Sequence, residues 1–519
     1  MRRYSIVAIL LFGLFVPLAN QSCTNLDEEL FTELTSDNFP QTDDEFISAL
    51  GAAYTSLYGL MNHNALFSAM EVSSDEAMIP QRGADWFDGG QWLRMHRHEM
   101  NPNEESILGG WNFCYNGISN CNRLVELFEG LVESGQVSAS EAAGFIGELK
   151  TLRALFYYWL LDVYGNVPIV TSFSSADAQP ATVLRGEVFN FIVSELEANV
   201  PNLTRERNGQ TYARVNYYVG KAIEAKLYLN AEVYTGTAQW AKAAAAADEI
   251  INSGLYSLEG NYFDNFSTEN AGSSENIFVV PYDQVFAQGF NLPQMTLHYG
   301  SQFTFDLQQQ PWNGYCSLQE FYNAYEANDI RRDGPVSRGY GNFISGPQFE
   351  SDGSSPVIDP SAEANDPDGA QLNFTPAINE HFPNCLRQAG VRMGKFEFAI
   401  GATPNLDNDF PIFRYADIML VKAEAALRQG NTGDALALVN QVRARAGVAD
   451  LGALTADDLL AERGREMFYE GWRRQDLIRF GKWTGTWDFK PASSPNTILM
   501  PIPANQLNAN PNLTQNAGY

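Results

Sequence analysis

The chain has 519 residues, of which 62 are acidic and 33 are lysine or arginine, so its formal net charge is −29 at pH 7. Such an acidic surface repels phosphate backbones, which excludes nucleic acid as a ligand and disfavours polyanionic substrates. Because 45% of the residues are hydrophobic and no Pro/Ser/Gly-rich linker interrupts the chain, we expect one large globular body.

The N-terminus has the pattern of a bacterial lipoprotein signal. Two arginines precede an apolar run over 4–19, which is too short to span a membrane comfortably. Ser22 supplies the small residue expected before an acylated cysteine, whereas Asn20 departs from the aliphatic residue of a strict lipobox. We therefore predict that 1–22 is removed and that Cys23 carries a lipid anchor. The alternative is an ordinary cleaved signal followed by an incidental cysteine.

The first part of the mature chain, 24–254, has the apolar spacing of a helical scaffold. Its last segment, 216–254, should form a helical hairpin, with a turn at 235–237 and a return helix that begins at Trp240. The many alanines of the return helix permit close packing, as in tetratricopeptide repeats. Other helices are expected over 43–61, 111–128, 145–163 and 185–200.

Between 255 and 409 the sequence changes to Gly, Pro, Asn, Ser and aromatic residues, with one short strand expected at 276–280. We expect a loop-rich insertion that carries the binding surface, since loops on a rigid scaffold are the usual place for it. The acidic stretch 352–369 offers oxygen ligands for a structural Ca²⁺ ion, and a loop without metal is the alternative. The spacing of Cys316 and Cys385 allows a disulfide without demanding one.

The last part, 410–519, begins with the clearest pattern in the chain. Apolar residues recur at helical spacing from Ala416, stop at the turn 430–433, and restart at Ala435. This spacing predicts an αα-hairpin over 410–447. One hairpin cannot bury both of its apolar faces alone, so it needs similar neighbours.

A long final helix should follow, capped by Thr455 together with Asp458. It places Glu462, Glu466 and Glu470 on one face at i, i+4 spacing, which would suit the carboxylate pair of a glycosidase. Because arginines surround all three, we favour a helix-borne ion network and keep the glycosidase as the alternative.

Other catalytic or metal-binding patterns are weak. The chain lacks GxSxG, HExxH, Walker and dinucleotide-binding motifs. His96 and His98 form a His-x-His pair, but a metal site would need further ligands, and the chain has 5 histidines in all. We therefore predict a protein that is not an enzyme.

Two aromatic loops are the better signal of function. Sugars stack their apolar C–H faces on Trp and Tyr rings, while their hydroxyl groups need polar partners such as Asn, Asp and Arg. Both loops offer this mixture, although packing of the same rings onto the scaffold is an equally simple explanation. The candidate ligand-binding residues are Arg82, Asp85, Trp86, Trp92, Trp312, Asn313, Tyr315 and Tyr340.

The mature chain as a whole resembles the SusD/RagB family of outer-membrane nutrient-uptake lipoproteins. The resemblance rests on the joint order of short blocks, each of them weak alone. It departs from the family at Ala517, where proline is frequent. The blocks are Leu152-Arg153-Ala154 with Tyr157, Tyr164-Gly165 with Pro168, Trp240 with Gly254 and Tyr256, Asp329-Ile330-Arg331, Phe413-Arg414-Tyr415-Ala416-Asp417, Ala423-Glu424-Ala425, Asn440 with Arg443 and Arg445-Ala446-Gly447, Glu466 with Glu470-Gly471, Asp476-Leu477, Pro501-Ile502-Pro503, and Gln515-Asn516 with Gly518-Tyr519.

The resemblance implies an all-α fold, in which tetratricopeptide-like helical hairpins form a scaffold with a loop-rich insertion and few short strands. It implies no catalysis. Members of the family are lipid-anchored on the outer face of the outer membrane, as lids over a SusC-like TonB-dependent transporter. They capture glycans, or sometimes peptides, for this partner. Because ligand contacts vary within the family, the candidate residues above are not carried over from it.

Overall fold

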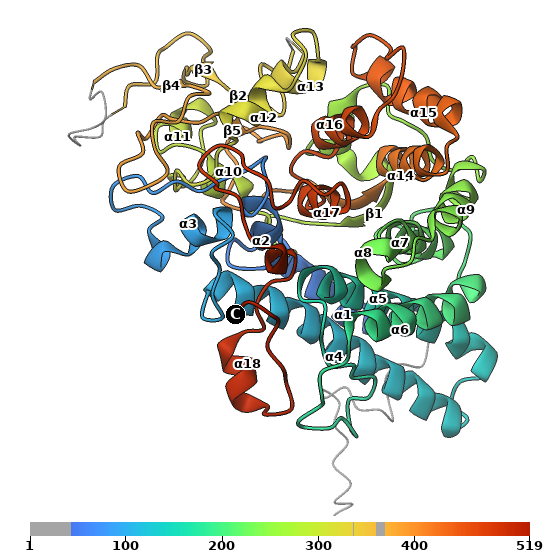
Figure 1. The fold of residues 1–519 in the computed structure, drawn as a ribbon. Helices are drawn as coiled ribbons and strands as arrows, with labels where there is room; N and C mark the ends of the chain where they lie inside the picture. Colours follow the sequence, from blue (N-terminus) through green and yellow to red (C-terminus); the bar gives the residue numbers. More distant parts are fainter. Residues whose placement is uncertain (1–42, 336, 360–368) are drawn as a thin grey trace, which may run out of the picture.

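The computed structural model describes residues 43–335, 337–359 and 369–519 (Figure 1). The predicted signal peptide, 1–22, and the predicted lipid-bearing Cys23 lie outside these residues. Within the described ranges, no helix has both the length and the apolar character that a membrane crossing requires.

Long helices build the first half of the scaffold. Helix α4 (Glu105–Glu133) lies along α5 (Ala139–Val163), and α6 (Arg185–Asn199) packs on α5. At the start of α5, Ser138 accepts a hydrogen bond from the Glu141 N–H and completes a capping box, which fixes the turn between the two long helices. Shorter elements precede them: α1 (Asp43–Tyr54), η1 (Thr55–Gly59), α2 (Leu66–Val72), η2 (Asp88–Gly90) and α3 (Gln91–His96).

Two further hairpins complete the scaffold. Helix α7 (Tyr217–Leu229) packs on α9 (Trp240–Ile251), and α14 (Tyr415–Arg428) packs on α15 (Thr432–Arg445). Helix α9 also packs on α14, so hairpins far apart in the sequence lie side by side (Figure 1). The prediction that the C-terminal hairpin needs similar neighbours is therefore confirmed. Two short elements connect these helices, η3 (Val200–Asn202) and α8 (Ala231–Thr235).

The insertion consists of short helices and two-stranded sheets beside the scaffold (Figure 1). Strand β1 (Asn276–Val280) confirms the predicted strand and pairs antiparallel with β6 (Phe410–Arg414). Strand β6 corrects the predicted start of the C-terminal hairpin, because these five residues are extended and buried and the helix begins only at Tyr415. The other elements are η4 (Tyr262–Phe266), η5 (Asn270–Gly272), α10 (Leu292–Thr296), α11 (Ser301–Thr304), α12 (Gln319–Asn323), α13 (Ile330–Asp333), β2 (Phe343–Ile344) paired with β5 (Arg392–Met393), and β3 (Gly346–Pro347) paired with β4 (Asn373–Phe374).

The predicted long final helix is wrong. Two shorter helices, α16 (Ala456–Met467) and α17 (Arg473–Arg479), take its place. Between them the N–H groups of Tyr469 and Gly471 donate to the carboxylates of Glu76 and Glu71, at 3.1 and 2.5 Å. Tyr469 also has a φ of 57°, outside the right-handed helical region. Hydrogen bonds to side chains on and beside α2 have thus replaced the bonds that would continue the helix.

Helix ends depart from the predictions elsewhere by a turn or two. Thr455 and Asp458 form the predicted capping box at the start of α16. The helix predicted over 43–61 ends as an α-helix at Tyr54, whereas the one predicted over 111–128 extends at both ends into α4. The chain ends with η6 (Pro495–Ile498) and α18 (Ala504–Ala509).

A buried ionic network joins the insertion to α16. Arg331 on α13 lies 2.7 Å from Glu462 and 3.0 Å from Glu466. Arg414 at the end of β6 lies 2.6 Å from Glu466 and 2.8 Å from Glu470. Burial alone would raise the pKa of the Glu462 carboxyl, but Arg331 and neighbouring charge hold it at about 2. The ion-network interpretation of the three glutamates is therefore confirmed.

Candidate functional site

Three aromatic rings from separate loops meet at the surface. Trp86 follows α2, Trp312 lies between α11 and α12, and His63 lies between η1 and α2. The ring centroids of Trp86 and Trp312 are 6.3 Å apart, and the His63 ring is 5.8 Å from the first and 5.7 Å from the second. Trp312 is 38% exposed and Trp86 is half-buried. We call these three residues the tryptophan platform.

The platform is held rigidly by its own backbone and by its neighbours. Trp86 has a φ of 58° and Asn313 a φ of 56°, a left-handed conformation that is uncommon for residues other than glycine. The indole N–H of Trp86 donates to the carbonyl oxygen of Trp312 at 2.7 Å. A Cβ on Gly314 would lie 2.5 Å from the Trp86 ring, so only glycine lets that ring settle there. Strained backbone of this kind persists where surrounding contacts over-determine it, and it clusters at functional sites.

Four of the predicted ligand-binding residues are buried beneath the platform and hold its loops. Arg82 donates to the carbonyl oxygens of Asn313 and Gly314 at 2.8 and 2.7 Å. Trp92 donates to the Asp88 carboxylate at 2.7 Å. These contacts correct the expectation that all candidate residues face a ligand, because the loops need polar and aromatic side chains to fasten them to the scaffold. The four buried residues are Arg82, Trp92, Asn313 and Tyr315, the last of which shares a hydrogen bond with Ser68.

Polar groups line the edge of the platform next to Trp86. Asp85 accepts a hydrogen bond from the Tyr299 hydroxyl and lies 3.9 Å from the Arg387 guanidinium. Arg387 in turn lies over the Tyr299 ring, 4.9 Å from its centroid. A carboxylate, a hydroxyl and a guanidinium are suitable partners for sugar hydroxyl groups. The structure thus brings Asp85 and Trp86 of the first aromatic loop next to Trp312 of the second, a proximity that the sequence alone did not predict.

The last candidate, Tyr340, belongs to a different cluster. Its hydroxyl accepts a hydrogen bond from the Phe398 N–H at 3.1 Å, and its ring packs against Phe305 and Phe398. These contacts pack the insertion, and a role of Tyr340 in ligand binding stays a prediction.

Sequence reasoning missed His63 and Tyr299. Burial lowers the pKa of the His63 imidazole from 6.5, so the ring is neutral at pH 7 and can both donate and accept. The signal available for it was its position in the polar turn Asn62-His63-Asn64 just before a helix. Tyr299 had no local signal, because its partner Asp85 is 214 residues away.

The sequence also offered two alternative sites, the three glutamates for a glycosidase and the His-x-His pair for a metal, and in the structure both sets of side chains are buried. Glu462, Glu466 and Glu470 are buried and paired with arginines, whereas the two carboxyl groups of a glycosidase flank the scissile bond of a bound sugar. The ring nitrogens of His96 and His98 are taken up by hydrogen bonds, three of them to backbone carbonyls. These histidines therefore pack the core rather than hold a metal.

Cysteines and acidic clusters add no metal centre to the described part of the chain. Within it, no group of three or more His, Cys, Asp or Glu side chains is arranged to hold a metal ion. Cys316 and Cys385 are both buried as free thiols, so they do not form a disulfide. Asp352 accepts hydrogen bonds from its own turn, and residues 360–368 of the acidic stretch lie outside the description. Calcium binding there stays a prediction.

Two family models match the chain. Residues 31–248 match a model described as starch-binding and associating with the outer membrane, and residues 389–492 match the SusD family. The starch-binding protein SusD of Bacteroides thetaiotaomicron is 28% identical over 415 residues, which cover 72% of each chain. A SusD-like protein of Bacteroides ovatus is 24% identical over 416 residues, covering 75% of this chain and 69% of that protein.

Solved structures share the fold. Surface glycan-binding protein A from Bacteroides thetaiotaomicron, in complex with laminarihexaose, has a TM-score of 0.72 at 24% identity and covers 91% of this chain and 99% of its own. A SusD superfamily protein from Parabacteroides distasonis has a TM-score of 0.74 at 21% identity, covering 94% and 100%. The helical scaffold with its loop-rich insertion therefore has the predicted fold class, and the chain belongs to the SusD-like family.

Proposed function

We propose that this chain is a non-catalytic, lipid-anchored protein of the outer-membrane surface that binds oligo- or polysaccharides. It passes them to a SusC-like TonB-dependent transporter and acts as the lid of that partner. The lipid anchor is the acylated Cys23, so the folded body stands at the surface without crossing the membrane.

One observation carries the glycan proposal: the tryptophan platform is exposed, rigid and bordered by polar groups. Trp312 and Trp86 offer faces on which the C–H face of a sugar can stack, while Asp85 and Tyr299 offer hydrogen-bond partners. Because the rings are fixed before the ligand arrives, little conformational entropy is lost on binding. The similarity to a starch-binding protein and to a glycan-binding protein in complex with laminarihexaose supports the same ligand class.

The burial and the low pKa of the Glu462 carboxyl support a function without catalysis. Retaining and inverting glycosidases need one carboxylic acid whose pKa is raised, beside a second carboxylate near the scissile bond. Glu462 has its pKa held at about 2 and is buried, so it stays ionised and out of reach. Energy for uptake then comes from the transporter, and this protein supplies only capture and release.

Binding by the soluble chain from Thr24 onward tests the proposal. Titration calorimetry against neutral oligosaccharides, beginning with the malto- and laminari- series, should detect saturable binding. Trp312→Ala and Trp86→Ala should each weaken it about tenfold or more, since a buried stacking contact is worth ~1.4 kcal/mol or more. Phe173→Ala, a change at another exposed aromatic (50% exposed), should leave affinity unchanged.

Three results would contradict the proposal in different ways. Unchanged affinity in both tryptophan variants would remove the platform as the site. Binding of peptides but of no glycan would favour the peptide-binding alternative within the family. Release of reducing sugar by the purified protein, lost in Glu466→Gln, would restore the glycosidase.

A further inference from the structure

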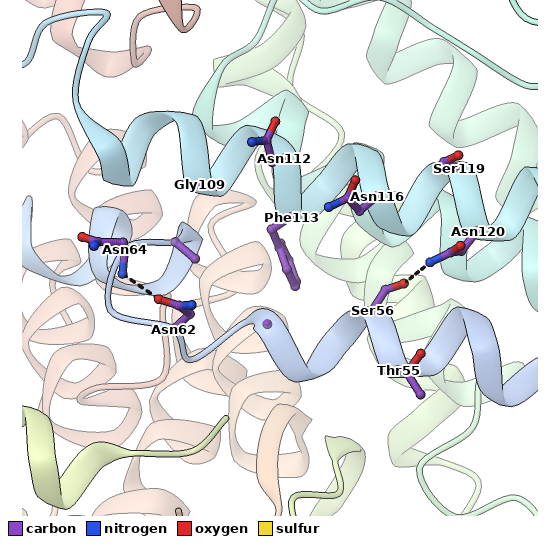
Figure 2. Close-up of a pocket in the computed structure, with 12 residues that line it drawn as sticks. Thr55, Ser56, Asn62, Asn64, Gly109, Asn112, Phe113, Asn116, Ser119 and Asn120 are labelled. Carbon is purple, nitrogen blue, oxygen red and sulfur yellow. Dashed lines mark hydrogen bonds between the residues drawn. The ribbon is translucent and has the colours of Figure 1, made fainter. Parts of the chain in front are cut away.

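A polar pocket of about 540 Å³ opens beside the tryptophan platform, between α4 and the segment from η1 to the start of α2 (Figure 2). Asn62 and Asn64 line it, and His63 of the platform stands between them in the chain. The turn 62–64 is therefore a wall common to the pocket and the platform. The pocket is lined by Thr55, Ser56, Gly59, Asn62, Asn64, Ala65, Gly109, Asn112, Phe113, Asn116, Ser119 and Asn120.

The lining is polar but uncharged. It contains five asparagines, two serines and one threonine, and none of the 62 acidic or 33 basic residues of the chain. Each carboxamide offers two N–H donors and one carbonyl acceptor, a combination that suits hydroxyl groups, which also donate and accept. A neutral ligand rich in hydroxyl groups fits this chemistry, whereas a charged ligand would lose its hydration without meeting an opposite charge.

Three of the asparagines form a row along α4. Asn112, Asn116 and Asn120 recur every four residues, so they share one face of the helix and follow each other at ~6 Å along its axis. Figure 2 shows Asn112, Asn116 and Asn120 one after another along α4, with the Asn120 side chain and the Phe113 ring pointing toward the facing segment. The row offers repeated polar contacts to a ligand that is itself a repeating chain.

Much of this hydrogen-bonding capacity is free. Within the described residues the Asn116 side chain makes no hydrogen bond, and Asn112 receives a single long one, at 3.4 Å from Gln506. Asn120 donates to Ser56 at 2.9 Å, which fixes one end of the row. Asn64 is oriented by Gln91, whose side chain donates to it at 3.2 Å.

The backbone approach at Gly109 gives the pocket its shape. A Cβ at this position would lie 1.8 Å from the carbonyl oxygen of Asn64, so only glycine lets the turn 62–64 sit directly on α4. That contact holds Asn62, Asn64 and His63 in a fixed relation to the row on the helix.

We propose that this pocket is a second subsite for the same glycan, taking neutral sugar units that continue the chain beyond those stacked on the platform. The inference rests on the proposed function and adds two properties to it. The ligand is an uncharged oligosaccharide, and chains long enough to span both sites bind more tightly than short ones.

Affinity as a function of chain length tests the inference. Laminaribiose with laminarihexaose, and maltose with maltohexaose, give matched short and long probes. The double variant Asn112→Ala/Asn116→Ala should weaken binding of the hexasaccharide about fivefold to tenfold and leave the disaccharide unaffected. Both side chains are exposed, so the fold should be retained, which unfolding midpoints check. Asn323→Ala, at an exposed asparagine of α12, is the control and should change neither affinity.

The outcomes separate this inference from the proposal beneath it. If Trp312→Ala weakens both probes while the double variant weakens neither, or weakens both equally, the second subsite is wrong and the glycan proposal stands. If the wild-type protein binds no probe of either series, both are wrong. Tighter binding of a uronate or sulfated chain than of its neutral counterpart would also overturn the uncharged pocket.

Discussion

Replacing Arg414 with methionine should test whether the buried ionic network holds this fold together. The Arg414 side chain is fully buried, and its Nη1 lies 2.6 Å from both Glu275 and Glu466. Its Nε lies 2.8 Å from Glu470. Methionine keeps the length and apolar bulk of the stem but removes the charge, so three buried carboxylates each lose one cation.

The expected loss follows from what those carboxylates retain. Glu466 still has Arg331 and Arg445 beside it, and Glu470 keeps its ion pair with Lys395. No carboxylate is left wholly unpaired, so the three losses do not simply add. Removing one partner from a buried pair costs ~3–5 kcal/mol, and we expect a loss in free energy of unfolding within this range.

Urea unfolding followed by tryptophan fluorescence at pH 7 measures that loss. The matched control is Arg332→Met, since Arg332 pairs with the exposed Asp333 at 2.6 Å. A surface pair of this kind contributes ~0–1 kcal/mol. Burial alone would raise the pKa of the Glu466 carboxyl, but the neighbouring arginines outweigh burial and hold this pKa below its usual 4.5. The ionised carboxylate therefore stabilises the fold above pH 4.5, and this contribution is lost as the pH falls through the lowered pKa. The gap between Arg414→Met and wild type should accordingly narrow in acid.

A loss no larger than that of the control would refute the reasoning. It would mean that Arg414 contributes no more to stability than an arginine in a surface pair. The carboxylates would then avoid the cost of a lost cation by taking up a proton or by contact with water.

Two further substitutions probe the bend between α16 and α17 and the close approach at Gly109. Burial raises the pKa of the Glu71 carboxyl from 4.5 to about 7, so wild-type stability should fall as pH rises across that interval. Glu71→Gln can still accept from the Gly471 N–H and should remove ~3 kcal/mol of that fall in the free energy of unfolding. Urea unfolding of both proteins at pH 5 and pH 8 measures the fall. If the variant loses as much stability between the two pH values as the wild type does, the assignment to Glu71 is wrong. Gly109→Ala should destabilise the protein and weaken hexasaccharide binding, because its Cβ would meet the Asn64 carbonyl at 1.8 Å. Gly130→Ala on the same helix has open space and should instead stabilise by ~0.5–1 kcal/mol; equal effects of the two alanines on unfolding would show that the close approach is unimportant.

Features that depend on nearby residues were predictable from the sequence. Helical spacing identified the hairpins at Trp240 and Ala435, and the Thr455 cap was read correctly, because helix periodicity and capping are local. The break after Met467 was not predictable. Its hydrogen bonds go to Glu71 and Glu76, about 400 residues away, and such tertiary contacts override local propensity.

In the candidate site, too, some features followed from the sequence and others depend on distant contacts. Residue type alone singled out Trp86 and Trp312, since aromatic rings with polar neighbours suit sugars, and their role in binding stays a prediction. It could not tell these rings from Trp92 or Tyr315, which have the same chemistry but lie beneath the loops. Which ring of a loop faces solvent depends on what the loop packs against, and that is set by distant partners such as Ser68.

The ionic network also limits how the molecule moves. Its charges come from the insertion (Arg331 and Lys395), from β6 (Arg414) and from α16, all of them away from water. A hinge between the insertion and the helices would have to pull these pairs apart and leave several charges alone in a dry interior. The insertion, in which Trp312 lies between α11 and α12, is therefore held to the scaffold by these pairs and moves together with it. Under the proposed function, closure over a transporter would be a movement of the entire folded body.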